Sequence, residues 1–331
     1  MIKTKTNFND FFFALRALVS RIYNRLSDIL LYQKITLIRQ EIKFLGLIVR
    51  CKNEPYVCEF VSYYLAQGID KIYILDDNSD VKIYKDVASK VEVVILLDFF
   101  KGSKNSQRLK IATMNRKVNS FYKRIKSAFE WIIYVDMDEY ITTKKNMHMT
   151  IREELQNTFK DSSCVKIPWV MMACNSIKSN PRSLLRTNIY RWNHDVRHEN
   201  NRSYENKFRC RYDTIEVKCI FKPRFFAGIY DHYPVNQNCK DISVVESIRN
   251  TKRKLDGFHE KLREIDISDG FLLCYHYRLV SIENCLDKIK YNVWHQKFHL
   301  EDLLSNDYPE LMDETLKNKS VRETADNLYF N

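Results

Sequence analysis

Asp136, Asp138 and Glu139 place three carboxylates within four positions of the chain. They follow Trp131–Val135, an apolar run of β-branched and aromatic residues that predicts a buried strand. Because strand side chains alternate between faces, Asp136 and Asp138 are expected to point the same way. Two carboxylates so close repel each other unless a cation or a proton relieves them. Hard oxygen ligands suit Mg²⁺ or Mn²⁺ shared with phosphates and water, so a divalent ion beside a phosphorylated ligand is predicted. A solvated acidic turn is the alternative.

Two earlier segments share this design of an apolar strand that runs into a polar loop. They are Leu45–Glu54 and Lys71–Asp80, separated by Glu59–Gln67, which has helical spacing and ends before Gly68. The order predicts a β-α-β unit, and ligands of open parallel sheets bind beyond the carboxyl ends of the strands. We therefore expect three strand ends to meet in one crevice. They are Lys52–Glu54, Asp76–Ser79 and Asp136–Glu139.

Glycine-rich phosphate loops are absent from the sequence, which has neither G-x-G-x-x-G nor G-x-x-x-x-G-K-[ST]. A dinucleotide-binding fold and a P-loop enzyme are therefore disfavoured. Metal-assisted binding of phosphate fits the acidic strand ends better.

Taken in order, the motifs resemble those of GT-A glycosyltransferases, in particular glycosyltransferase family 92 and related family-2-like sequences. The resemblance covers roughly residues 44–290 and rests on the order and spacing of short motifs. They are Arg50-Cys-Lys-Asn-Glu54, Glu59-Phe-Val-Ser-Tyr63, Gly68-Ile-Asp70, Leu75-Asp-Asp-Asn-Ser-Asp80, Trp131 to Glu139, Ile167-Pro-Trp169, Lys218 to Pro223, Asp231-His232 and Tyr275-His-Tyr-Arg278 with Ser281. Two motifs depart from the family pattern: a glutamine and a Tyr-Asn pair survive only as Gln107 and Met114-Asn115, and Arg191–His198 replaces a glycine-rich piece.

This resemblance implies an α/β fold of the GT-A type, Rossmann-like, with a mixed and mostly parallel central sheet flanked by helices. Asp138, and Asp136 directly or through water, would hold Mn²⁺ or Mg²⁺ to offset charge on a departing nucleoside diphosphate. His276 is expected as the third metal ligand, because GT-A enzymes commonly add a C-terminal histidine, and His232 is the second choice. A hydrogen-bonded core histidine is the alternative interpretation.

The resemblance also assigns the remaining site residues. Asp76 or Asp77 would accept hydrogen bonds from the ribose or the base, and Asn53 or Glu54 would line the nucleotide pocket. Inversion at the anomeric carbon needs a carboxylate base near the acceptor hydroxyl. Asp231, Glu199 and Asp195 are the candidates, and Asp231 is preferred because it follows a strand-like segment.

Four regions are expected along the chain: a basic amphipathic helical segment at 1–43, a nucleotide-sugar-binding half at 44–150, an acceptor-binding half at 151–295 and a helical tail at 296–331. The second half begins with a predicted helix, Ile151–Phe159. Strands are predicted at Ser163–Met172, Ser183–Arg191, Thr214–Phe221, Phe225–Tyr230 and Phe271–Tyr277.

The formal net charge is +12, from 54 Lys and Arg against 42 Asp and Glu, which favours anionic partners. Residues 1–43 contain no apolar stretch of the ~18–20 residues that a spanning helix needs. They are expected either to lie on an anionic membrane surface or to pack on the catalytic domain. Nine cysteines without a C-x-x-C pair suggest reduced thiols, and hence a cytoplasmic protein, peripheral on the inner face of the membrane.

Together these observations predict a metal-dependent glycosyltransferase that moves a hexose, galactose by the family resemblance, with inversion. The donor would be a nucleotide diphosphate sugar, first a UDP-sugar, and the acceptor an oligosaccharide or glycolipid such as a surface polysaccharide or lipopolysaccharide. A metal-dependent nucleotidyltransferase or phosphohydrolase is the first alternative, and a basic nucleic-acid- or membrane-binding protein without catalysis is the second. Nucleic acid is not expected as a partner, because no RNP, KH, zinc-finger or helix-turn-helix signature occurs.

Overall fold

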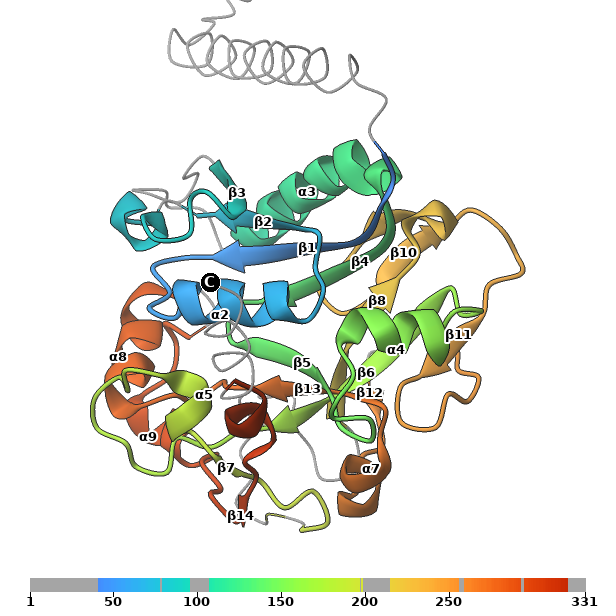
Figure 1. Ribbon diagram of the computed structural model, residues 1–331. Coiled ribbons are helices and arrows are strands. Elements are labelled where there is room, and N and C mark those ends of the chain that lie inside the picture. The colour runs from blue at the N-terminus through green and yellow to red at the C-terminus, as the bar shows by residue number, and fades with distance from the viewer. Residues whose placement is uncertain are drawn as a thin grey trace, which may run out of the picture. The chain divides into compact units, whose positions relative to one another are not determined.

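The computed structural model describes residues 41–77, 79–95, 107–196, 198, 215–255, 259–292 and 295–320. The chain from Lys43 onward forms one compact unit, to which the following description applies (Figure 1). Residues 1–40 lie outside the described residues, so the amphipathic helix expected there stays a prediction. Within the described ranges, no helix is long and apolar enough to cross a membrane.

A ten-stranded sheet forms the centre of this unit, in the order β3-β2-β1-β4-β8-β6-β13-β5, with β11 beside β6 and β12 beside β8. Its strands are β1 (Lys43–Cys51), β2 (Lys71–Asp76), β3 (Val91–Ile95), β4 (Phe129–Asp136), β5 (Glu139–Thr143), β6 (Cys164–Met171), β8 (Ile215–Phe221), β11 (Val244–Glu246), β12 (His259–Glu260) and β13 (Leu272–His276). The strands from β3 to β4 run parallel, while β8 is antiparallel to both β4 and β6. The predicted α/β class with a mixed, mostly parallel sheet is confirmed, and strands from both predicted halves belong to this sheet.

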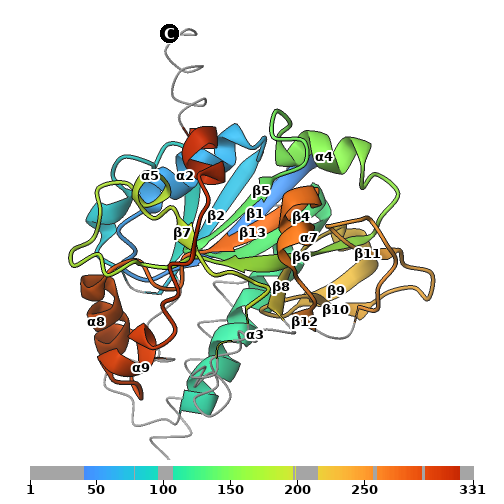
Figure 2. The ribbon, with the colours of Figure 1, turned by 90° about the horizontal axis from the view of Figure 1, so that it is seen from below.

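Helices and small sheets surround the central sheet. The helices are α2 (Val57–Ala66), α3 (Gln107–Ile125), α4 (Ile151–Asn157), α5 (Leu184–Thr187), α7 (Glu264–Asp269), α8 (Ile282–Tyr291) and α9 (Leu300–Leu304), with 3₁₀ turns η1 (Val81–Tyr84), η2 (Lys126–Ala128) and η3 (Pro223–Phe225). β9 (Phe226–Ile229) pairs with β10 (Pro234–Gln237), and β7 (Tyr190–Arg191) pairs with β14 (Leu311–Met312). In both views α8 and α9 lie side by side, away from β10 and β11 (Figure 1 and Figure 2).

One predicted strand, Ser183–Arg191, is wrong in its first part, because α5 occupies 184–187 and only β7 is extended. The Ser183 hydroxyl accepts a hydrogen bond from the Arg186 N–H and so caps the helix. The Glu59 carboxylate of α2 accepts a second bond, at 2.8 Å, from the N–H of Leu184. A contact from a distant helix therefore stabilises a helical turn where the local sequence favours a strand.

The alternation of β1 side chains explains why α2 and α3 cover opposite faces of the sheet. Leu47 and Val49 belong to the same buried cluster as Phe60 of α2. Ile48 belongs to a second cluster with Phe121 of α3. Figure 1 shows the two helices on either side of β1 and β4. The apolar run of β1 is therefore buried on both faces, as in the strands of a sheet that helices cover on both sides.

Strand register brings the polar strand ends to one edge of the sheet. Cys51 at the end of β1 lies beside Asp76 of β2, and Arg50 lies beside Asp136 of β4. At the other end of the strand order, His276 is the last residue of β13 and pairs with Glu139 of β5. The predicted meeting of the three strand ends is confirmed by this register.

Candidate active site

The acidic run forms the connection between β4 and β5. Asp136 is the last residue of β4 and Glu139 is the first of β5, so Met137 and Asp138 make the turn between them. The backbone of this turn is tied to β13, because the Tyr277 N–H donates to the Asp138 carbonyl at 2.8 Å. The expectation that Asp136 and Asp138 share one strand face therefore does not hold, and their carboxylates contact different partners.

The Asp136 carboxylate lies between two cations. Arg50 donates from Nε at 2.8 Å and from Nη2 at 2.6 Å to the same oxygen, Oδ1. Lys218 donates to the other oxygen, Oδ2, at 3.1 Å. Burial would raise the pKa of Asp136, but Arg50 and Lys218 together carry it well below its usual range. Asp136 is therefore ionised and fixed in orientation.

The same two cations connect Asp136 to the preferred base candidate, Asp231. Arg50 Nη1 lies 3.2 Å from the Asp231 Oδ1 atom, and Lys218 Nζ donates to the Asp231 carbonyl at 2.9 Å. Lys218 also lies 3.2 Å from Glu139, whose pKa burial raises to about 8. The structure thus brings Asp231 into the acidic site, although it follows Asp136 by almost a hundred residues.

The Asp138 carboxylate has its own two partners. Lys288 of α8 donates to Oδ2 at 2.8 Å, and His276 Nε2 lies 3.7 Å from Oδ1. Burial would raise the pKa of Asp138, but Lys288 carries it below its ordinary value. Burial lowers the pKa of His276 to about 3, so its imidazole is neutral at ordinary pH. We call these eight residues the charged cluster: Arg50, Asp136, Asp138, Glu139, Lys218, Asp231, His276 and Lys288.

Asp138 and His276 are the pair in this cluster that fits a divalent ion. A neutral imidazole and a carboxylate oxygen are both metal ligands, and here Nε2 and Oδ1 face each other. The His276 Nδ1 atom is buried and has no hydrogen-bond partner among the described residues. Both oxygens of Asp136 are instead engaged by Arg50 and Lys218. No set of three or more acidic, histidine or cysteine side chains in the described ranges is arranged around one metal position.

The predicted nucleotide residues lie in the loops after β1 and β2. Asn53, which has a φ of 51°, accepts a bond at 2.9 Å from the Asp80 N–H and so ties the two loops together. Asp76 is only 2% exposed and accepts a hydrogen bond from the Tyr84 hydroxyl, so it stabilises the loop from the buried side. Asp77 is half-buried, and its carboxylate lies 3.3 Å from the Lys52 Nζ atom.

Glu54 lies in the same loop as Asn53, after β1. Burial raises its pKa to about 7, Lys288 opposes the shift, and Asp138 and Asp136 add to it. The charges of Lys288, Asp138 and Asp136 therefore influence the protonation of the Glu54 carboxyl group.

The other candidates contact residues that do not belong to the cluster, or lie outside the described residues. Asp195 is exposed and accepts a bond at 3.2 Å from the Glu264 N–H, at the start of α7. His232 contacts the ring of Trp169, as His276 does, but its Nδ1 atom faces the Val217 carbonyl at 3.0 Å. Glu199 lies outside the described residues. Of the three candidate bases, Asp231 is the one that the structure places in the cluster.

Sequence reasoning missed the three cations of the cluster as site residues. Arg50 and Lys218 lie within strands of mostly apolar residues, and charged side chains in buried strands are rare unless they are paired. That signal could have found both. Lys288 lies in a helix with several other charged residues, and nothing local marks it.

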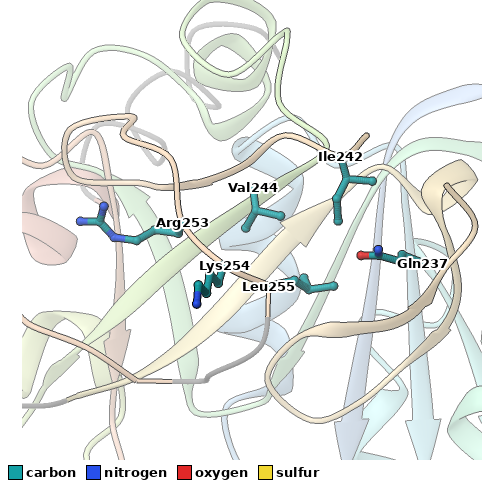
Figure 3. Close-up of a pocket in the computed structure, with 6 residues that line it drawn as sticks. All are labelled: Gln237, Ile242, Val244, Arg253, Lys254 and Leu255. Atoms are coloured by element: carbon teal, nitrogen blue, oxygen red, sulfur yellow. The ribbon is translucent and has the colours of Figure 1, made fainter. Parts of the chain in front are cut away.

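A separate hollow of about 360 Å³ opens near β10 and β11 (Figure 3). Its lining residues are Gln237, Ile242, Val244, Arg253, Lys254 and Leu255. Val244 pairs with Cys164 at the start of β6, whereas Met171 at the end of β6 pairs with His276. Seven residues of strand separate the two positions, roughly 20 Å at the usual rise per residue. This hollow is therefore not part of the charged cluster.

Comparison with known proteins agrees with the chemistry of the cluster. Residues 52–302 match the family model for glycosyltransferase family 92, a span that includes every cluster residue except Arg50. A comparison with curated proteins gave no match. Because the matched span exceeds half of the chain, the protein belongs to glycosyltransferase family 92 and is a glycosyltransferase.

Proposed function

We propose that this glycosyltransferase transfers a hexose from a nucleoside diphosphate sugar to a hydroxyl group of a glycan, with the help of Mn²⁺ or Mg²⁺. The observation that carries the proposal is the approach of Asp138 and His276 to 3.7 Å at the edge where the strand ends meet. Both side chains would hold the ion, and diphosphate oxygens and water would complete its coordination. When bound, the ion would supply Lewis acidity to the departing diphosphate.

Asp136 would act on the donor rather than on the metal. Arg50 and Lys218 fix its carboxylate, yet 31% of its side chain remains exposed. An ionised carboxylate that is held in one orientation can accept hydrogen bonds from the hydroxyl groups of a sugar or a ribose. Asn53 and Asp77, in the adjoining loops, would contact the nucleotide. A uridine nucleotide and galactose are the donor parts that the family resemblance favours.

Asp231 is the proposed base for an inverting transfer. Its ion pair with Arg50 fixes the carboxylate, and the bond from Lys218 to its carbonyl fixes the backbone. A base must lie within hydrogen-bond reach of the acceptor hydroxyl, and Asp231 shares Arg50 with the residue proposed to contact the donor sugar. The acceptor class proposed is an oligosaccharide or glycolipid, such as a surface polysaccharide or lipopolysaccharide.

Hydrolysis of a panel of nucleotide sugars, with Mn²⁺ or with excess chelator, tests the metal-dependent part of the proposal. Asp138→Asn keeps the shape of the side chain but removes its charge, so it should lower turnover at least ~100-fold if one catalytic electrostatic contact is lost. Asp269→Asn, at an exposed carboxylate at the end of α7, is the matched control and should keep full turnover. Undiminished hydrolysis in chelator, or in Asp138→Asn, would contradict the proposal.

A further inference from the structure

Lys288 of α8 is a buried cation that contacts Asp138, a residue 150 positions earlier in the chain. Its side chain is 9% exposed, and Nζ donates to Asp138 Oδ2 at 2.8 Å and to the Arg278 carbonyl at 2.7 Å. An ammonium group has three N–H donors. Two of them are used by these contacts, which leaves the third N–H without a hydrogen-bond acceptor in the part of the chain that the structure describes.

The charge of Lys288 is maintained by its surroundings. Burial would lower the pKa of Lys288, but Asp138 and then Glu54 raise it above the ordinary value. Removing a charged group from water costs several kcal/mol unless well-placed partners offset the cost. A neutral side chain at this position of α8 would avoid that cost but would leave the Asp138 carboxylate without its cation.

The position of Lys288 also defines what the Asp138 carboxylate can do. With Oδ2 held by the ammonium group, Oδ1 faces His276. Glu54, in the loop after β1, lies close enough to influence the Lys288 charge. The ammonium group of Lys288 thus contacts Asp138, one of the two residues proposed to hold the metal ion.

We propose that Lys288 is a donor-binding residue, which orients Asp138 and donates its third N–H to a phosphate oxygen of the nucleotide sugar. The inference rests on the proposed function and adds a prediction of its own. His276 would strengthen binding of a nucleoside diphosphate only through the metal ion. Lys288 would strengthen it with or without the metal, because its contact with the phosphate is direct.

A purely structural role is the competing explanation, and Lys166 offers a matched control for it. Lys166 is also buried, pairs with Glu260 at 2.6 Å and donates to the Lys254 carbonyl at 3.5 Å. It lies near the start of β6, at the other end of the strand from the cluster. Lys166→Met should therefore destabilise the fold as a broken buried pair does, without an effect on the donor.

The experiment measures the affinity of the full chain for uridine diphosphate by calorimetry, in excess chelator and in Mn²⁺, together with thermal unfolding of each variant. Lys288→Met should weaken binding at least ~10-fold in both conditions, as loss of one charged hydrogen bond implies. Lys288→Arg should keep part of the affinity. Lys166→Met should bind uridine diphosphate like the wild type, even if its melting temperature falls as far as that of Lys288→Met.

Three results would overturn the inference. Wild-type affinity in Lys288→Met with a lower melting temperature would leave Lys288 a structural role only. A loss confined to Mn²⁺ would mean that Lys288 acts through Asp138 and not on the phosphate. If Lys288→Met does not fold, Lys288→Gln replaces it, with the same expected loss in both conditions. Absence of uridine diphosphate binding by the wild type would instead contradict the proposed donor, and this inference with it.

Discussion

His194→Gln should protect the fold against acid, because His194 is a buried histidine that cannot accept a second proton without losing its contact. Its Nε2 atom accepts a hydrogen bond at 3.2 Å from the Met171 N–H at the end of β6. Burial, together with the nearby charges of Arg191 and His198, lowers the pKa of His194 to about 3. The nearby Glu264 carboxylate does not counteract this shift, because it binds the His194 backbone N–H and the guanidinium of Arg191.

The sign of the pH effect follows from the lowered pKa. The unfolded chain binds a proton at His194 below the ordinary pKa of about 6.5, whereas the folded chain does so only near pH 3. The stability from neutral His194 is therefore fully present above pH 6.5 and is lost as the pH falls toward 3. The free energy of unfolding falls by up to about 1.4 kcal/mol for each pH unit in this range. The loss between pH 7.0 and 4.5 is therefore about 2–3 kcal/mol.

Urea unfolding of the wild type and of His194→Gln at several pH values between 7.0 and 4.5 measures this difference. The glutamine carbonyl can still accept the Met171 N–H, but it does not titrate. The variant should therefore lose about 2–3 kcal/mol less than the wild type over this range. His148→Gln, at an exposed histidine, should follow the wild type. Parallel curves for His194→Gln and the wild type would refute the reasoning.

Two further predictions concern carboxylates that hold distant segments together. Asp313→Asn should lower the free energy of unfolding by about 3 kcal/mol, because Asp313 accepts bonds from Arg191 at 3.0 Å and from Tyr275 at 2.9 Å in a buried site. Urea unfolding checks this value, and an unchanged midpoint would contradict it; Glu314→Gln, at a surface pair, should change little. Glu59→Gln should lower the free energy of unfolding by about 1–2 kcal/mol, because it weakens the cap of α5. The melting temperature should fall accordingly, and a melting temperature equal to that of the wild type would exclude the capping role.

The elements that sequence predicted well are those whose burial pattern is local. The β-α-β unit from β1 to β2 and the strand β4 follow from continuous apolar runs that end in polar residues, and the structure places them in one parallel set. The segment 184–187 failed because its helical turn depends on Glu59, more than a hundred residues away. Local propensity is a weak prior wherever a tertiary contact supplies the cap.

The same distinction applies to the site. Its acidic residues can be predicted from their spacing in the sequence, whereas the cations that pair with them cannot. Asp136 and Asp138 are two positions apart in the chain, so their repulsion follows from the sequence itself. Their partners Lys218 and Lys288 follow at distances of 82 and 150 residues. In the fold each of these acids pairs with a different lysine. The two carboxylates therefore have different surroundings, although their spacing in the sequence does not distinguish them. Asp138 is left facing a neutral histidine, and Asp136 is left with ionic partners on both oxygens. We therefore expect Asp136→Asn and Asp138→Asn to differ in kind, the first in the apparent affinity for the donor and the second in the dependence on metal.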